Sequence, residues 1–262
     1  MKNNFRLSFL FKKVAFVASL LLIIAILFAF RSRKKPKILV FSKTTGFVHS
    51  CIPVGNAAIV KLGMENGFDV DTTKEAGVFN NDNLGKYAAI VFLNTTEGKE
   101  DLLNENQKNA LIEYMHKGGG WMGIHAATDA GYRWPWYLKL SGAYFFSHPK
   151  QQEATINVVD ASHISTKHLP AKWVRADEWY NFREMNKDVK VLLKIDEKSY
   201  TGGANGDDHP MAWYHDYDGG RAFYTELGHT EISYADPLYL KHILGGIQYA
   251  MGVNKKGKRD RD

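Results

Sequence analysis

Histidines are the residues of this chain whose types and positions most suggest chemistry. Of the ten in the sequence, five fall at expected loop or strand-end positions. Imidazole changes charge near neutral pH and, when neutral, ligates borderline metals. These five are candidates for acid–base catalysis, for holding substrate hydroxyls or for binding a divalent metal: His49, His125, His148, His209 and His229.

His125 has the most informative context. Residues 118–124 (GGGWMGI) predict the end of a helix and a short buried strand, and His125 stands in the sharp turn that follows. In α/β enzymes, ligands bind at the carboxyl ends of such strands. In α/β-hydrolases this turn carries a nucleophilic serine. Neither Ile124 nor His125 can be a usual acyl-transfer nucleophile, so we expect different chemistry.

Two carboxylates complete the catalytic candidates. Glu178 is followed by Trp179 and Tyr180, and a carboxylate between large rings would be desolvated and have a raised pKa, as a general acid needs. A solvated position on the outer face of a strand is the alternative. Asp129 lies four residues after His125 and could either orient that ring or cap the segment that follows.

The metal question stays open at this point. The sequence contains no His-Glu-x-x-His helix and no other tight ligand spacing. Dispersed ligands remain possible, and we assign His209 and His229 as the metal candidates, with His49 and His148 as substrate ligands. Arg221 could supply positive charge to a substrate, although a salt bridge on a surface hairpin is the better explanation of it.

Aromatic side chains are abundant in the expected loops. Rings can hold the apolar face of a sugar, and core packing is the alternative for any one of them. The run of residues 132–137 (YRWPWY) is hard to bury as a whole, so part of it should line a cleft or a partner surface. We assign three of the rings to substrate binding: Trp179, Tyr180 and Trp213.

Cys51 is the single cysteine, which excludes an intrachain disulfide and a thiolate metal cluster. It lies two residues after His49, which suggests a Cys–His nucleophile. A buried, unreactive thiol is the commoner arrangement and is our expectation.

The amino terminus predicts a membrane segment. Residues 14–30 are apolar except for Ser19, and basic residues flank them in a tail (1–13) and a linker (31–36). About 17–25 residues suffice to span a bilayer, and no small-x-small cleavage site follows. We therefore expect an uncleaved signal-anchor with the domain on the extracytoplasmic, periplasmic side.

The charge distribution disfavours a nucleic-acid partner. The net charge is +6, but residues 1–35 hold 8 basic and no acidic residues. The remainder has 26 basic against 28 acidic residues, or −2, and part of that positive charge lies in a charged tail (253–262). The folded body is therefore acidic, which a nucleic-acid-binding surface is not.

The order of elements predicts an α/β fold. Strands are expected at 37–41, 68–70, 87–93 and 121–124, with helices at 53–66 and 104–117 between them, so the sheet should be parallel with helices on both faces. Farther along, strands at 153–159, 173–179, 189–195, 211–217 and 221–227 predict added β-hairpins. A helix at 237–251 closes a single domain of residues 37–252.

Five segments together resemble the ThuA-like family, which is associated with trehalose utilisation and has a class I glutamine amidotransferase-like fold. They are TGFVH (45–49), GGGWMGIHA (118–126), GAYFFSHP (142–149), HPMAW (209–213) and GRAFYTELGHT (220–230). The resemblance implies a three-layer flavodoxin-like core without the amidotransferase triad. It also implies a role in disaccharide catabolism through 3-keto sugars made by a partner, such as an NAD-dependent sugar oxidoreductase.

These expectations combine into an enzyme that acts on a disaccharide or 3-keto-glycoside. His125 and Glu178 would serve as acid and base, with Asp129 supporting them and a divalent metal optional. A ketone acidifies the neighbouring C–H, so removal of that proton can drive elimination of the aglycone. The alternative is a non-catalytic carbohydrate-binding module that uses the same aromatic and histidine surface.

Overall fold

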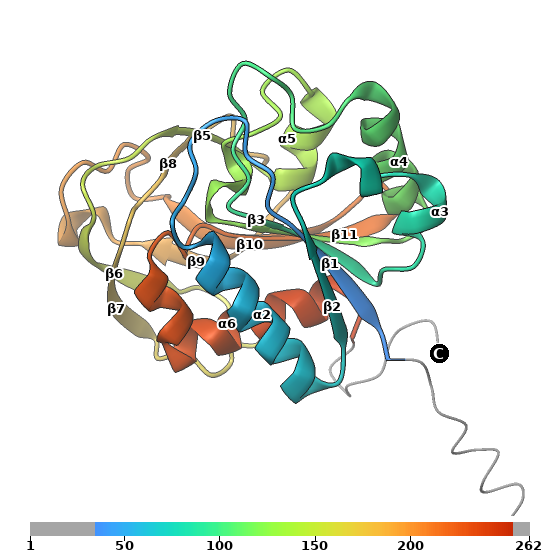
Figure 1. Cartoon of the computed structure of the whole chain (residues 1–262). Coiled ribbons are helices and arrows are strands. Elements are labelled where there is room, and N and C mark those ends of the chain that lie inside the picture. The colour runs from blue at the N-terminus through green and yellow to red at the C-terminus, as the bar shows by residue number, and fades with distance from the viewer. Residues whose placement is uncertain (1–34, 254–262) are drawn as a thin grey trace, which may run out of the picture. The chain divides into compact units, whose positions relative to one another are not determined.

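The computed structural model describes residues 35–253 and contains one large sheet with helices on both of its faces (Figure 1). The sheet has nine strands in the order β2-β1-β3-β4-β11-β10-β9-β6-β7, and β5 and β8 form a separate two-stranded ribbon. The strand bounds are β1 Lys37–Phe41, β2 Asp69–Thr73, β3 Ala89–Leu93, β4 Gly120–Ile124, β5 Tyr144–Ser147, β6 Gln152–Val158, β7 Lys172–Asp177, β8 Asn181–Arg183, β9 Lys190–Ile195, β10 Pro210–Tyr217 and β11 Gly220–Thr225.

The helices divide between the two faces of the sheet. In Figure 1, α2 and α6 lie together on one face, and α3, α4 and α5 lie on the other. This gives the three layers expected of an α/β fold. The helix bounds are α2 Ile52–Asn66, α3 Asn81–Leu84, α4 Glu105–His116, α5 Pro135–Ser141 and α6 Pro237–Ala250.

Half of the sheet is parallel, as the alternation of strands and helices predicts. β1 pairs in parallel with β2 and β3, β3 with β4, and β4 with β11. Every residue of β3 and β4 is buried, because helices cover both faces and leave no solvated side. The carboxyl ends of these strands therefore meet at one edge of the sheet.

The other half is antiparallel, which brings the end of a distant strand to the same edge. Each pairing from β11 through β10, β9 and β6 to β7 reverses the direction. After four reversals β7 runs in the same direction as β11, so Asp177 at its carboxyl end and Thr225 at that of β11 lie at the same edge. The predicted hairpin is present: Asp218 and Gly219 form its turn with φ angles of 52° and 85°.

Local signals set the helix ends. The Asn104 side chain accepts from the amide of Gln107, whose own side chain accepts from the Asn104 amide, so the predicted capping box starts α4. Gly118 follows that helix with φ 78°, the expected left-handed termination. The Asp236 side chain caps α6 at the amide of Leu238.

The structure does not describe residues 1–34 and 254–262. The predicted basic tail (1–13), the signal-anchor (14–30), residues 31–34 of the linker and residues 254–262 of the charged tail therefore lie outside the described residues. Within residues 35–253, no helix is both long and apolar enough to cross a membrane.

Candidate active site

His125 occupies a strained turn immediately after β4. Its φ of 48° is in the left-handed region, which residues other than glycine rarely adopt. The backbone is held there by Tyr224, whose hydroxyl donates to the carbonyl of His125 at 2.7 Å. The side chain is fully buried, and its Nδ1 lies 2.7 Å from the carbonyl of Glu226. Because a carbonyl can only accept, Nδ1 carries a proton, and Nε2 is the nitrogen that faces the other groups of the site.

Two further groups meet that nitrogen. His229, four residues after β11, places Nδ1 3.0 Å from Nε2 of His125. Glu178, the first residue after β7, places Oε2 3.4 Å from the same nitrogen and 3.0 Å from Nδ1 of His229. Three strands that are not consecutive in the chain thus bring two imidazoles and a carboxylate into direct contact.

His49 completes this inner group from the loop between β1 and α2. Its ring lies 5.2 Å from the ring of His125 and 5.1 Å from that of His229, edge to face in both cases. One donor atom from each of His49, His125, Glu178 and His229 lies within 4.8 Å of the other three. Burial, together with the neighbouring imidazoles, lowers the pKa of His49 to about 3, so this ring is neutral.

His148 lies outside the inner group, toward solvent. Its Nδ1 lies 3.2 Å from Oε1 of Glu178 and 2.9 Å from the carbonyl of Pro149. Nδ1 therefore bears the hydrogen, and Nε2 is the free nitrogen. The side chain is 44% exposed, against 9% for Glu178. His148 can thus exchange protons with solvent or with a ligand that enters the site.

The expectation of a raised pKa at Glu178 is wrong. Burial does act in that direction, but hydrogen bonds and charge from His125 and His229 outweigh it and hold the pKa of Glu178 well below its usual value. The carboxyl group is therefore ionised and cannot be a general acid in this state. It is suited instead to balance positive charge among the histidines or on a cation.

Asp129 has the raised pKa that was expected of Glu178. Burial raises the pKa of Asp129 to about 6, although the Tyr132 hydroxyl, 2.6 Å away, opposes the rise by donating to Oδ1. The carboxylate contacts Tyr132 rather than His125. A carboxyl group with a pKa of about 6 can exchange protons near neutral pH, but Asp129 does not orient the His125 ring.

Two buried carboxyl groups hold the backbone of residues in and next to the inner group. Asp177 accepts from the amides of Glu178 and His229 through Oδ1, and from the Gly228 amide through Oδ2. Glu226 is fully buried and accepts from the amide of Tyr180. Burial raises the pKa of Glu226 well above its usual value, which favours the neutral carboxyl group.

Of the three aromatic rings predicted to bind substrate, only Tyr180 lies at the cluster. Its ring is 4.3 Å from the His125 ring and 4.2 Å from that of Phe145. Trp179 is fully buried and donates to the carbonyl of Gln152. Trp213 is also fully buried in the core, where its indole donates to the carbonyl of Ser141.

His209 and Arg221 lie apart from the cluster. Both ring nitrogens of His209 have partners, Glu197 at 2.7 Å and the carbonyl of Tyr180 at 2.8 Å, so this residue supports the Tyr180 segment. Arg221 starts β11 at the opposite edge of the sheet, where it donates to the carbonyls of Gly118 and Ala250. A position at a strand end does not reveal which edge of the sheet that end occupies.

Cys51 is not placed to act as a nucleophile. It is fully buried, and its Sγ contacts the carbonyl of Gly228 and the side-chain amide of Asn94. Burial raises the pKa of Cys51 to about 12, so the thiol stays protonated at neutral pH.

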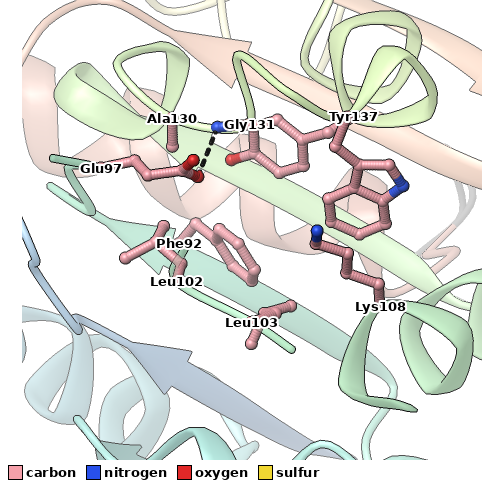
Figure 2. Close-up of a pocket in the computed structure, with 9 residues that line it drawn as sticks. Phe92, Glu97, Leu102, Leu103, Lys108, Ala130, Gly131 and Tyr137 are labelled. Atoms are coloured by element: carbon pink, nitrogen blue, oxygen red, sulfur yellow. Dashed lines mark hydrogen bonds between the residues drawn. The ribbon is translucent and has the colours of Figure 1, made fainter. Parts of the chain in front are cut away.

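A small pocket lies beside the loops of the active site and shares none of the cluster residues (Figure 2). Phe92 and two leucines form its apolar wall, and Glu97 accepts from the Gly131 amide at 2.8 Å. Its charged groups are paired: Glu97 with Arg133, and Lys108 with Asp101. The pocket therefore has no free charged group with which to bind a polar substrate.

Sequence reasoning did not identify three parts of the site: the bridging role of Asp177, the Tyr132–Asp129 contact and the Phe145 ring. Asp177 lies near the end of the strand predicted at 173–179, and nothing in the sequence marks it as a bridge. Its five hydrogen-bond donors come from two segments that are distant in the chain, residues 175–178 and 228–233. Phe145 lies within the GAYFFSHP segment, but the sequence does not show to which side its ring points or that the ring contacts Tyr180.

Solved structures similar to this chain include two ThuA-like proteins. The one from Bacteroides uniformis ATCC 8492 is 27% identical, with a TM-score of 0.72, and the match covers 87% of this chain and 97% of that one. The one from Parabacteroides merdae ATCC 43184 is 23% identical, with a TM-score of 0.69, covering 83% and 90%.

The PurLQS structure from Thermotoga maritima is 14% identical with a TM-score of 0.51, covering 82% of this chain and 99% of that one. This likeness concerns the fold alone and supports the glutamine amidotransferase-like architecture. No curated protein matches the chain. The family model ThuA, described as trehalose utilisation, matches residues 37–250, and the chain therefore belongs to the ThuA family.

Proposed function

We propose that this protein is an enzyme that acts on a disaccharide or a 3-keto-glycoside in sugar catabolism, with the histidine–glutamate cluster as its active site. One observation carries the proposal. Four histidines and a carboxylate from five separate segments converge at the edge of the sheet where α/β enzymes bind ligands. The family description, trehalose utilisation, supports a sugar as the substrate.

The chemistry that suits this arrangement is elimination from a keto sugar. In a 3-keto-glycoside the ketone acidifies the C–H at C2, and a base removes that proton to leave an enolate. The electron pair then forms a C1–C2 double bond as the bond from C1 to the aglycone oxygen breaks, and that oxygen takes a proton. The reaction needs a base, an acid and positive charge near the ketone oxygen.

The described residues include groups that can transfer protons and, separately, the inner group, which can interact with the ketone oxygen. His148 and Asp129 can exchange protons, the first because it is exposed and the second because its pKa is about 6. The inner group of His49, His125, Glu178 and His229 is suited to stabilise the enolate oxygen. Glu178 therefore moves from the acid–base role assigned from the sequence to the inner group.

The wider setting follows as part of the same proposal. A 3-keto sugar must be made by an oxidoreductase, so an NAD-dependent sugar dehydrogenase is the expected partner. The apolar residues 14–30 would anchor the protein to the membrane with the domain on the periplasmic side.

The alternative is a non-catalytic carbohydrate-binding module. To separate the two, the purified full-length chain is incubated with 3-keto disaccharides, and both sugar release and binding are followed. Release that is lost in His125→Asn supports the enzyme. Asparagine is chosen because it tolerates the positive φ at this position. Binding without release contradicts the enzyme and favours the module.

A further inference from the structure

We propose that His49, His125, Glu178 and His229 form a binding site for one divalent transition-metal ion, with an open coordination position on the side of His148. Zinc, manganese, iron(II) and nickel are the ions that the donor set suits.

The spacing of the donor atoms matches a metal site. A tetrahedral ion with ligand bonds of about 2.05 Å separates its ligands by about 3.3 Å. Within the inner group, Oε2 of Glu178 lies 3.0 Å from Nδ1 of His229 and 3.4 Å from Nε2 of His125, and those two nitrogens are 3.0 Å apart. All four donor atoms fall within 4.8 Å of one another, so a small movement of the His49 side chain completes the set.

The protons of His125 are arranged as a metal ligand requires. Its Nδ1–H donates to the carbonyl of Glu226, which leaves the Nε2 lone pair directed at the other donors. A histidine that binds a metal through one nitrogen almost always donates its other N–H to a carbonyl or carboxylate. The buried Glu226 backbone therefore supplies the second-shell contact that fixes this tautomer.

His49 adds an independent observation. It is 3% exposed, and within residues 35–253 its Nδ1 has no hydrogen-bond partner. A buried polar atom without a partner is costly, and a native structure keeps such an atom for a reason. The ring packs edge to face with both His125 and His229, so His49 lies directly against the other members of the cluster.

The donor chemistry selects the class of ion. Three imidazoles and one carboxylate suit zinc, iron, manganese or nickel, whereas magnesium and calcium prefer oxygen ligands and water. Glu178 uses only Oε2 in the inner group, and its Oε1 faces His148 on the exposed side. A substrate oxygen entering from that side would reach the ion beside a group that can move protons. This last role rests on the proposed sugar chemistry, but the ion site does not.

Metal binding tests the site without any substrate. The full-length chain is freed of metal with a chelator and titrated with Zn²⁺ by calorimetry, with Mg²⁺ as the comparison. We expect one Zn²⁺ per chain and no saturable binding of Mg²⁺. His229→Ala and His49→Ala should each weaken Zn²⁺ binding at least 100-fold while circular dichroism stays native. His116→Ala, which removes a half-exposed histidine on α4, should leave it unchanged.

The proposal is overturned if the folded wild-type chain binds no transition metal, or if both cluster variants bind Zn²⁺ as tightly as the wild type does. Two variants are used so that a folding defect in one does not decide the question. The failure of this site is distinguishable from that of the enzyme. A chain that binds Zn²⁺ but cleaves no keto-glycoside refutes only the proposed activity, and one that cleaves it in chelator without binding metal refutes only the site.

Discussion

The side chain of Asp177 joins the backbone of Glu178 to that of His229. Its Oδ1 accepts from the Glu178 amide at 3.1 Å and from the His229 amide at 3.2 Å. Its Oδ2 accepts from Arg175, Gly228 and Ser233, so one fully buried carboxylate receives five hydrogen bonds. Asp177 thus positions two members of the inner group relative to each other although it is not one of them.

Replacing Asp177 by asparagine should loosen this junction. One of the two carboxylate oxygens becomes an NH₂ group that faces donors instead of accepting from them, and Arg175 loses one of its two charged partners, keeping only Asp236. We expect a loss of about 3 kcal/mol in the free energy of unfolding. We also expect the affinity for Zn²⁺ to fall about 10–100-fold, because positioning contacts of a metal site have effects of that size.

Urea unfolding and calorimetry measure these two effects. Asp216→Asn, at an exposed position in β10, is the matched control and should change neither. Unchanged Zn²⁺ affinity in a destabilised Asp177→Asn protein would show that Asp177 supports only the fold.

The raised pKa of Asp129 predicts a stability that falls with rising pH. The carboxyl group has a pKa of about 6 in the folded chain, because burial outweighs the Tyr132 hydrogen bond, against 3.8 for the unfolded reference. Between these values the folded state binds more protons, so stability is lost as pH rises across this window. Asp129→Asn should therefore be more stable than the wild type near neutral pH, by about 1–2 kcal/mol.

Unfolding of both proteins in urea at several pH values tests this expectation. The advantage of Asp129→Asn should shrink as pH falls and reach its minimum below about pH 3.8, where the wild-type carboxyl group is mainly protonated in both states. Tyr132→Phe, which removes the hydrogen bond to Asp129, should raise the pKa of the carboxyl group further. An Asp129→Asn protein that is less stable than the wild type at neutral pH would contradict the assignment.

A buried histidine in the core predicts the opposite dependence on pH. His242 on α6 donates from Nδ1 to the carbonyl of Ser165, and its Nε2 lies 3.0 Å from the hydroxyl of Thr225. Burial lowers the pKa of His242 from 6.5 to about 3, so the folded state binds fewer protons than the unfolded state between those values. Stability present above pH 6.5 is therefore lost as pH falls, by up to about 1.4 kcal/mol per pH unit.

His242→Gln should be less stable than the wild type near neutral pH, because it disturbs two buried hydrogen bonds. The difference should narrow as pH falls, since glutamine does not titrate. Parallel curves for His242→Gln and the wild type between about pH 7 and 5 would refute the neutral, buried state of His242.

Cys51 should be dispensable for catalysis. Its pKa of about 12, raised by burial, keeps the thiol protonated, so iodoacetamide should not alkylate it in the folded chain. Cys51→Ala should retain turnover within about twofold and lose about 1 kcal/mol of stability through the missing sulfur contacts. A 100-fold loss of turnover in a folded Cys51→Ala protein would instead support the cysteine nucleophile.

Local patterns predicted most of the fold. The apolar run at 37–41 and the capping residues Asn104 and Asp236 act within a few residues of themselves, so the sequence displays them directly. The short elements α5, β5 and β8 were not predicted. α5 has seven residues, β5 has four and β8 has three. Segments this short hold too few turns or alternations for hydrophobic periodicity to be recognised.

The candidate site was predictable only in part. Loop and strand-end positions identified His49, His125, His148 and His229, and the adjacent aromatic rings identified Glu178; the structure brings these five together. The sequence also selected His209 and Arg221, which lie elsewhere, because position along the chain does not fix the edge of the sheet or the direction of a side chain. The pKa of Glu178 also depends on contacts with His125 and His229, which are distant in sequence, so its burial alone gave the wrong direction.

The most direct test of the active site is the rate of sugar release from a 3-keto disaccharide by the full-length chain with Zn²⁺ or Mn²⁺, comparing the wild type with Glu178→Gln. Glu153→Gln, an exposed position on β6, is the matched control. We predict release by the wild type and the control, and a rate at least about 1,000-fold lower in Glu178→Gln, which loses the charge at the centre of the cluster. Equal rates in all three proteins would contradict a reaction at this cluster.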